Sequence, residues 1–113
     1  AAEQRALSTL LAAGLVLIKR NFRSRRGEID LVMREGGVLV FVEVRLRSSA
    51  RHGGALSSLD PAKCRRLLAA AEIFLARNPR YAINPARFDL VAFDGPAAPA
   101  QWIKGAFCQE HIR

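Results

Sequence analysis

The chain has 113 residues, of which 50% are hydrophobic and 25% are charged. This composition excludes a disordered chain, and a domain of this size buries roughly two-thirds of the surface that its unfolded chain exposes. No apolar run approaches the roughly 20 residues that span a bilayer, and two cysteines are too few for a disulfide scaffold. We expect a single domain over residues 1–113. A cytoplasmic location is the default, because no small-residue cleavage site follows the apolar stretch at 6–18.

The charge of the chain is strongly basic. Lysine and arginine number 18 against 10 acidic residues, which gives a formal net charge of +8. Most of the cations are arginines, whose guanidinium groups bind phosphate oxygens in a two-pronged geometry. Such a balance favours polyanions, either nucleic acid or an acidic membrane surface. We expect nucleic acid and no membrane; the alternative is a solvated basic surface that only keeps the chain soluble.

The first quarter of the chain predicts a helix, a short strand and a basic loop. Residues 3–13 carry apolar side chains at three- and four-residue spacing, and Gly14 suits the end of a helix. Residues 15–18 form a short apolar run that is typical of a strand. The following segment, 19–27, contains five cations and is expected to be a loop.

Two strands and a tight turn follow. Residues 28–34 alternate between polar and apolar side chains, and residues 38–46 are rich in β-branched side chains. The glycine pair at 36–37 between them indicates a hairpin. The apolar residues that alternation places on one face of the first strand are Ile29, Leu31 and Met33.

The second half predicts a helix between strands. After a polar segment at 48–59, Asp60 and the proline behind it are a typical helix start, and an apolar stripe runs along Pro61–Arg77. Residues 87–93 are a fourth strand and 101–104 a short last one. The order α-β-β-β-α-β is that of an α/β fold with a central mixed sheet flanked by helices. The helix would connect the third and fourth strands, which then run parallel.

The hairpin register has a chemical consequence. If residues 36–37 form a two-residue turn, Asp30 lies opposite Glu43 and Glu28 lies opposite Arg45, with all four side chains on one face. A three-residue turn would shift the register by one residue and separate them.

Two carboxylates opposite each other repel, and a divalent cation would resolve that repulsion. Carboxylate oxygens are the ligands that Mg²⁺ and Mn²⁺ prefer. Apolar residues surround Glu43 in its strand, so its carboxylate needs a partner when it is buried. The alternative is a structural ion pair of Arg45 with Glu43 or with Glu28.

Three motifs resemble those of the YraN-like family of small bacterial proteins. They read GEIDLV at 27–32, FVEVRLR at 41–47 and RFDLV at 87–91, and the resemblance extends from Glu3 to about Phe93. That family is similar to archaeal Holliday junction resolvases. The resemblance implies a restriction-endonuclease-like core and a homodimer, the form in which resolvase relatives act.

The resemblance also implies roles for individual residues. Asp30 and Glu43 fall on the two positions that bind Mg²⁺ or Mn²⁺ in nuclease relatives, and Glu3 falls on a helical glutamate that completes the metal site. Glu28 belongs to the family motif in a supporting role. The chain departs from the Glu-x-Lys pattern at Arg45, where the nuclease relatives carry a catalytic lysine. A guanidinium keeps the positive charge but does not release its proton at neutral pH.

Several cations lie beside the proposed metal site in the sequence. Contacts of this kind position a nucleic-acid backbone without reading its sequence. Lys63 has an alternative as part of a solvated helix face, and Trp102 either stacks on a base or anchors the last strand. Asp89 is expected to pair with a nearby arginine. The residues that we expect to bind nucleic acid are Arg23, Arg25, Arg26, Arg47, Arg51 and Lys63.

Three functions are compatible with this pattern. The first is a metal-dependent nuclease that hydrolyses phosphodiester bonds in structured or branched DNA, with Asp30, Glu43 and Arg45 as its catalytic residues. The second is a catalytically weak or inactive nucleic-acid-binding module on the same fold, which the arginine at position 45 favours. The third is a protein-interaction domain whose charge serves solubility alone.

Overall fold

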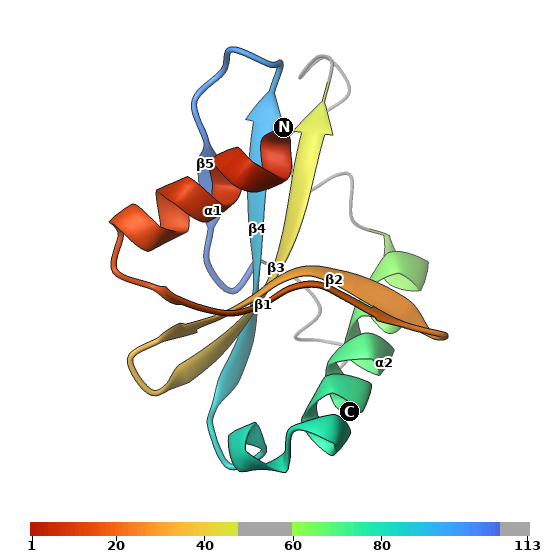
Figure 1. Ribbon diagram of the computed structural model, residues 1–113. Coiled ribbons are helices and arrows are strands. Elements are labelled where there is room, and N and C mark those ends of the chain that lie inside the picture. The colour runs from red at the N-terminus through yellow and green to blue at the C-terminus, as the bar shows by residue number, and fades with distance from the viewer. Residues whose placement is uncertain (48–59, 107–113) are drawn as a thin grey trace.

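A computed structural model of the chain describes residues 1–47 and 60–106 (Figure 1). The polar segment 48–59, which contains Arg51, lies outside the described residues. Within the described parts, no helix is long and apolar enough to cross a membrane. The elements in chain order are α1 (Ala2–Ala12), β1 (Val16–Ser24), β2 (Gly27–Glu35), β3 (Val38–Arg47), α2 (Pro61–Arg77), the short 3₁₀ helix η2 (Pro79–Tyr81), β4 (Ala86–Asp94) and β5 (Gln101–Ile103).

The strands form one mixed sheet in the order β1-β2-β3-β4-β5. Neighbouring strands are antiparallel except β3 and β4, which run parallel because α2 connects them. The expected α-β-β-β-α-β order and the parallel central pair are therefore confirmed. This α/β architecture is consistent with a restriction-endonuclease-like core.

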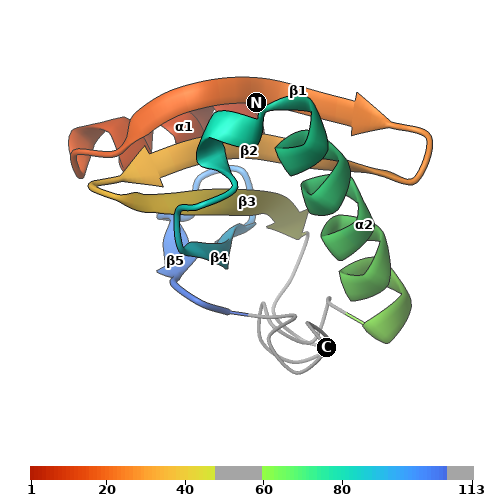
Figure 2. The same cartoon turned by 90° about the horizontal axis from the view of Figure 1, so that it is seen from below.

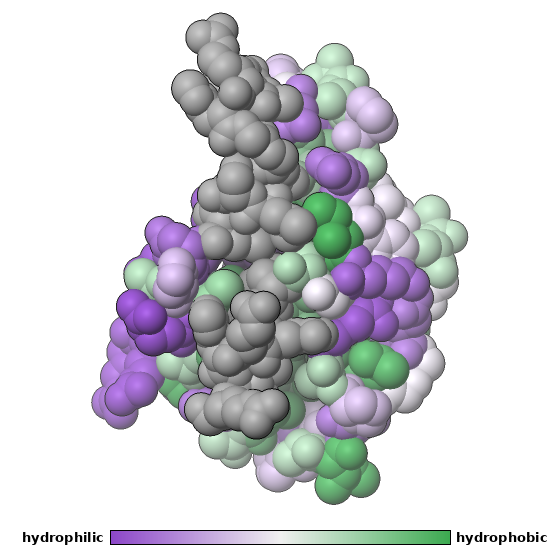
Figure 3. All heavy atoms as spheres, turned by 180° about the vertical axis from the view of Figure 1, so that it is seen from behind, coloured by the Kyte–Doolittle hydropathy of each residue, from purple (hydrophilic) through white to green (hydrophobic). Residues whose placement is uncertain are grey.

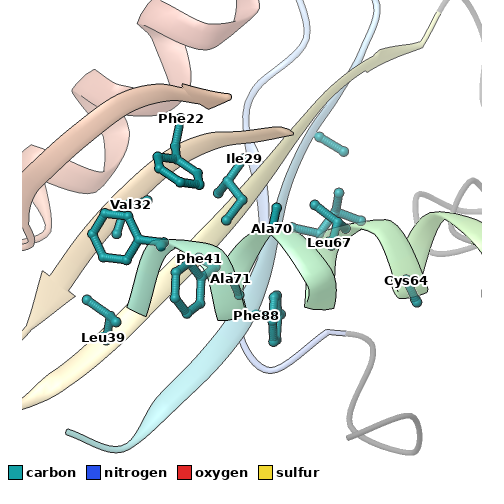
Figure 4. Close-up of a cluster of buried hydrophobic side chains, with 13 residues drawn as sticks. Phe22, Ile29, Val32, Leu39, Phe41, Cys64, Leu67, Ala70, Ala71 and Phe88 are labelled. Carbon is teal, nitrogen blue, oxygen red and sulfur yellow. The ribbon is translucent and has the colours of Figure 1, made fainter. Parts of the chain in front are cut away.

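The two helices cover opposite faces of the sheet, and each seals its own core. Alternation along β3 separates the cores, since Val40 and Val42 point to the α1 side while Leu39 and Phe41 point to the α2 side. On the α2 side, shown in Figure 4, Phe74 meets the ring of Phe41 edge-on at 6.0 Å between ring centroids. The helical residues buried in the two cores are Ala6, Leu7 and Leu10 of α1, and Cys64, Leu67, Ala70, Ala71 and Phe74 of α2.

The basic loop expected at 19–27 is mostly a strand, so that prediction is wrong. Strand β1 continues to Ser24 and pairs with β2 up to that residue. Phe22 supplies the reason, because it is buried and meets the ring of Phe74 edge-on at 5.3 Å between centroids. Asn21, one of the residue types that tolerates the left-handed region, takes φ 51° just before it. A burial that depends on a distant helix leaves little signal in the local sequence.

The expectation that Ile29 shares a face with Leu31 and Met33 is also wrong. Ile29 lies in the α2-side core with Phe22, whereas Leu31 and Met33 lie in the α1-side core. Regular alternation would keep all three together, so β2 departs from it between Ile29 and Leu31. The irregularity falls at Asp30.

Candidate metal centre

The turn at residues 36–37 sets the register of the β2–β3 hairpin as the sequence predicts. Glu35 pairs with Val38, and Gly36 has φ 58°, which a two-residue turn of this kind requires. The backbone pairing then runs to Leu31 opposite Val42 and ends there. Asp30 and Glu43 are the next residues on the two strands.

Where the backbone pairing of β2 and β3 ends, the side chain of Asp30 provides the next hydrogen bond between the two strands. Its Oδ2 accepts a hydrogen bond from the backbone N–H of Val44 at 2.8 Å. The pKa of Asp30 is raised to about 6, chiefly by burial. The charge and a side-chain hydrogen bond of the adjacent Glu43 and the charge of Glu3 act in the same direction, and the Val44 hydrogen bond opposes the rise. The predicted approach of Asp30 and Glu43 is therefore present, and it puts two acidic groups in one partly dry site.

Glu43 is almost fully buried, with 4% of its surface exposed, and it meets two cations. Its Oε2 lies 3.1 Å from Nζ of Lys63 and 3.2 Å from Nε of Arg45. The Nε of Arg45 is buried but is not aligned to donate a hydrogen bond. The expected ion pair of Glu43 with Arg45 is present, but it accounts for only one oxygen of the carboxylate.

Helix α2 brings Lys63 to this point. The side chain of Asp60 caps the helix by accepting from the backbone N–H of Lys63 at 2.7 Å, as the sequence predicts. Because the first turn of α2 approaches β3, the Lys63 ammonium points to the sheet and is 27% exposed. The interpretation of Lys63 as part of a solvated helix face is therefore wrong.

The arrangement suits a hard divalent cation. Oδ2 of Asp30 and Oε2 of Glu43 are engaged, whereas Oδ1 of Asp30 and Oε1 of Glu43 receive no N–H donor from the described residues. Mg²⁺ typically binds one or two carboxylates and keeps water and phosphate oxygens as its other ligands. Asp30 and Glu43 would hold such an ion with one oxygen each.

Glu3 has closer partners than the carboxylate pair. Its Oε1 lies 3.3 Å from a terminal nitrogen of Arg20 and accepts a hydrogen bond from Asn21 at 3.1 Å. In residues 1–47 and 60–106, no three His, Cys, Asp or Glu side chains gather closely enough to hold a metal together. The role of Glu3 as a third ligand stays a prediction. Glu28 is exposed and lies opposite Arg23 on β1, and the β2–β3 pairing does not extend to it.

The predicted nucleic-acid-binding residues that the structure describes lie in three places, one of which is Lys63 in the first turn of α2. Arg23, Arg25 and Arg26 are exposed at the end of the β1–β2 hairpin. Arg47 ends β3 and lies 4.0 Å from Asp94, and Arg51 is outside the described residues. Sequence reasoning missed two exposed arginines on α2, which follow Lys63 within one helical turn.

A second buried carboxylate lies on β4. Asp89 accepts hydrogen bonds from Arg87 and from the indole N–H of Trp102, which is 3.0 Å away. The expected pairing of Asp89 with an arginine is confirmed, and the contact of Trp102 agrees with its interpretation as an anchor for β5.

The fold and the carboxylate pair define the class of the molecule, an α/β domain of endonuclease-like architecture with acidic side chains at the point where two strands separate. The model of "Uncharacterised protein family UPF0102" matches residues 2–93, and the chain belongs to this family. This is the YraN-like family that the motifs indicate.

Curated relatives carry the same family name and cover most of the chain. A UPF0102 protein of Pseudomonas entomophila is 50% identical over 110 residues, which are 95% of this chain and 89% of the relative. One from Halorhodospira halophila is 51% identical over 109 residues, with 96% and 85% covered. One from Ralstonia nicotianae is 54% identical over 111 residues, with 95% and 83% covered.

Proposed function

We propose that this protein is a metal-dependent nuclease that hydrolyses phosphodiester bonds in structured or branched DNA. The observation that carries the proposal is the carboxylate pair of Asp30 and Glu43. The two groups adjoin although like charges repel, and each keeps one oxygen without an N–H donor from the described residues. Folding stability does not favour such a pair, whereas Mg²⁺ or Mn²⁺ would stabilise it.

Each side chain has a task in this proposal. When bound, the metal ion supplies a Lewis acid for the scissile phosphate. The Val44 N–H fixes Asp30, and Lys63 and Arg45 hold the carboxylate of Glu43 through its Oε2. Hydrolysis joins a water oxygen to phosphorus, breaks one ester P–O bond and gives the leaving oxygen a proton.

Lys63 adds a second cation at the carboxylate oxygen that Arg45 contacts. The guanidinium of Arg45 keeps its protons, so it can stabilise negative charge but cannot accept a proton from water. The ammonium of Lys63 has three N–H donors and contacts the same carboxylate oxygen at 3.1 Å. It therefore has donors left for a phosphate oxygen beside the metal site. We propose that Lys63 is the lysine of this site, supplied by α2 and not by β3.

A nucleic-acid-binding module with weak or no catalysis is the second candidate. The observation that favours it is Arg45, which occupies the position where the nuclease relatives of this family carry a lysine. In that case the net charge of +8 would still attract DNA, and binding would not need a divalent cation.

The test is cleavage of labelled four-way-junction, flap, single-stranded and duplex DNA with Mg²⁺ or Mn²⁺. The wild type is compared with Asp30→Asn/Glu43→Gln and with Glu72→Gln, a control that removes an exposed carboxylate of α2. We expect metal-dependent cleavage by the wild type and the control, and none by the double variant. Binding of DNA without cleavage by any of the three proteins would favour the second candidate. Equal cleavage by all three would contradict the proposed site.

A further inference from the structure

We propose that the tip of the β1–β2 hairpin and the first two turns of α2 form one rigid clamp for a sugar-phosphate backbone. In this clamp, Arg65 and Arg66 of α2 act together with Arg23, Arg25 and Arg26 of the hairpin. The inference rests on the proposed function and extends it, since it names where the DNA strand lies as it leaves the metal site.

The hairpin tip is a built structure. The hydroxyl of Ser24 donates to the carbonyl of Gly27 at 2.8 Å and accepts from the backbone N–H groups of Gly27 at 3.2 Å and Arg26 at 3.3 Å. One side chain thus ties both ends of the turn together. Arg25 and Arg26 are therefore presented from a defined turn, which lowers the conformational entropy that binding would cost.

The tip is also fixed against α2. A Cβ atom at Gly27 would lie 2.6 Å from the backbone carbonyl oxygen of Arg66, so only glycine allows the two backbones to approach this closely. The edge-to-face contact of Phe22 with Phe74 holds the same two elements together further along the helix. Figures 1 and 2 both show the end of the hairpin beside the helix. The two groups of arginines therefore belong to one surface.

The charge of this surface has no ion-pair partner among the described carboxylates. All five arginines are exposed, and none forms an ion pair with a carboxylate of the described residues. By contrast, Arg87 contacts two carboxylates and Arg20 contacts one. Glu28 is the acidic side chain of the tip, opposite Arg23. Figure 3 shows hydrophilic side chains gathered on this side of the molecule.

The clamp adjoins the metal site through α2. Residues three apart on a helix are neighbours on its surface, so Arg66 follows Lys63 directly, and Lys63 contacts Glu43 at 3.1 Å. A DNA strand with one phosphate at the proposed metal site beside Glu43 would continue past Arg66 to the hairpin tip. Such contacts position the backbone and do not read bases, which suits a protein that recognises the shape of DNA.

The test measures binding of labelled duplex and junction DNA in EDTA over a range of NaCl concentrations. Without divalent metal, the result does not depend on cleavage. The wild type is compared with Arg65→Gln/Arg66→Gln and with Arg34→Gln/Arg80→Gln, which removes the same charge from a pocket lined by residues of β1, β2 and η2.

Losing two phosphate contacts should lower the slope of log affinity against log salt by about 2 in the α2 variant, while the control keeps the wild-type slope. Equal changes of the slope in both variants would mean that only the net charge matters. An unchanged slope in the α2 variant would mean that its two arginines do not contact DNA. Either result overturns the clamp, as does a wild type that does not bind DNA. If the slopes change as expected but no DNA is cleaved, the nuclease proposal is wrong and the clamp is supported. If DNA is cleaved but the slopes do not change, the clamp is wrong and the nuclease proposal is supported.

Discussion

Asp89 and Glu43 are buried carboxylates on neighbouring strands, and their surroundings differ. Asp89, with none of its surface exposed, accepts from Nε and a terminal nitrogen of Arg87 at 2.9 and 3.1 Å, from the Trp102 indole at 3.0 Å and from the Gly105 backbone N–H at 2.9 Å. Both of its oxygens have two donors. Such a group is satisfied by the protein alone and serves the structure.

Glu43 is nearly as buried, but among the described residues no N–H donor reaches its Oε1. Two cations meet one of its oxygens, and another carboxylate, Asp30, adjoins it. Two protein donors on each oxygen thus mark a structural carboxylate, whereas a buried carboxylate beside a like charge agrees with our proposal of a bound cation.

The largest expected effect would test the structural half of this comparison. Replacing Asp89→Ala leaves an indole and a backbone N–H without their acceptor and leaves the Arg87 guanidinium with Glu35 alone, and breaking a buried pair of this kind costs about 3–5 kcal/mol. We expect a loss of that size in the free energy of unfolding by urea. A loss below about 1 kcal/mol would contradict the structural role of Asp89.

A smaller loss is expected at the contact between the hairpin and α2. Gly27→Ala would place a methyl group 2.6 Å from the Arg66 carbonyl oxygen, and a backbone atom cannot move aside cheaply. We expect a loss of about 1–3 kcal/mol, measured by urea denaturation. The matched control is Gly37→Ala, where a Cβ meets nothing within 4 Å. Equal losses in the two variants would show that the close contact does not matter.

The smallest expected effect is a gain in the free energy of unfolding, and it concerns the carboxylate pair of Asp30 and Glu43. Burial raises the pKa of Asp30 to about 6, so the folded protein binds this proton more tightly than the unfolded chain. The stability from this group is fully present below about pH 4 and is lost as the pH rises through about 6. Asp30→Asn keeps an acceptor for Val44 without the charge. Because the site is partly exposed, we expect the Asp30→Asn substitution to stabilise the metal-free protein at pH 7.5 by only about 1 kcal/mol.

Thermal unfolding of wild type and Asp30→Asn between pH 4 and 8 measures this gain. The difference between the two proteins should shrink towards pH 4. A variant that is less stable than the wild type at pH 7.5 without metal would show that Asp30, like Asp89, serves the structure.

Much of this architecture could be predicted because its signals are local. The cap at Asp60 and the apolar stripe behind it predict α2 with its observed ends, Pro61 and Arg77. The turn at 36–37 fixes the register of a hairpin, and the register alone brings Asp30 towards Glu43.

What could not be predicted depends on tertiary contacts. Strand β1 extends to Ser24 because Phe22 packs on a helix some 50 residues away in the chain. Lys63 reaches Glu43 because of where α2 packs against the sheet, which the residues of the helix do not encode by themselves. Asp30 is held by a backbone N–H, which leaves no mark in a sequence.

The measurement that tests the central claim most directly is calorimetric titration of Mn²⁺ and Mg²⁺ into the metal-free protein at pH 7.5 and pH 5. We predict binding by the wild type that weakens at pH 5, where Asp30 holds its proton, and no binding by Asp30→Asn/Glu43→Gln. Absence of binding to the wild type, or equal binding to the double variant, would contradict the assignment of the carboxylate pair as a metal site.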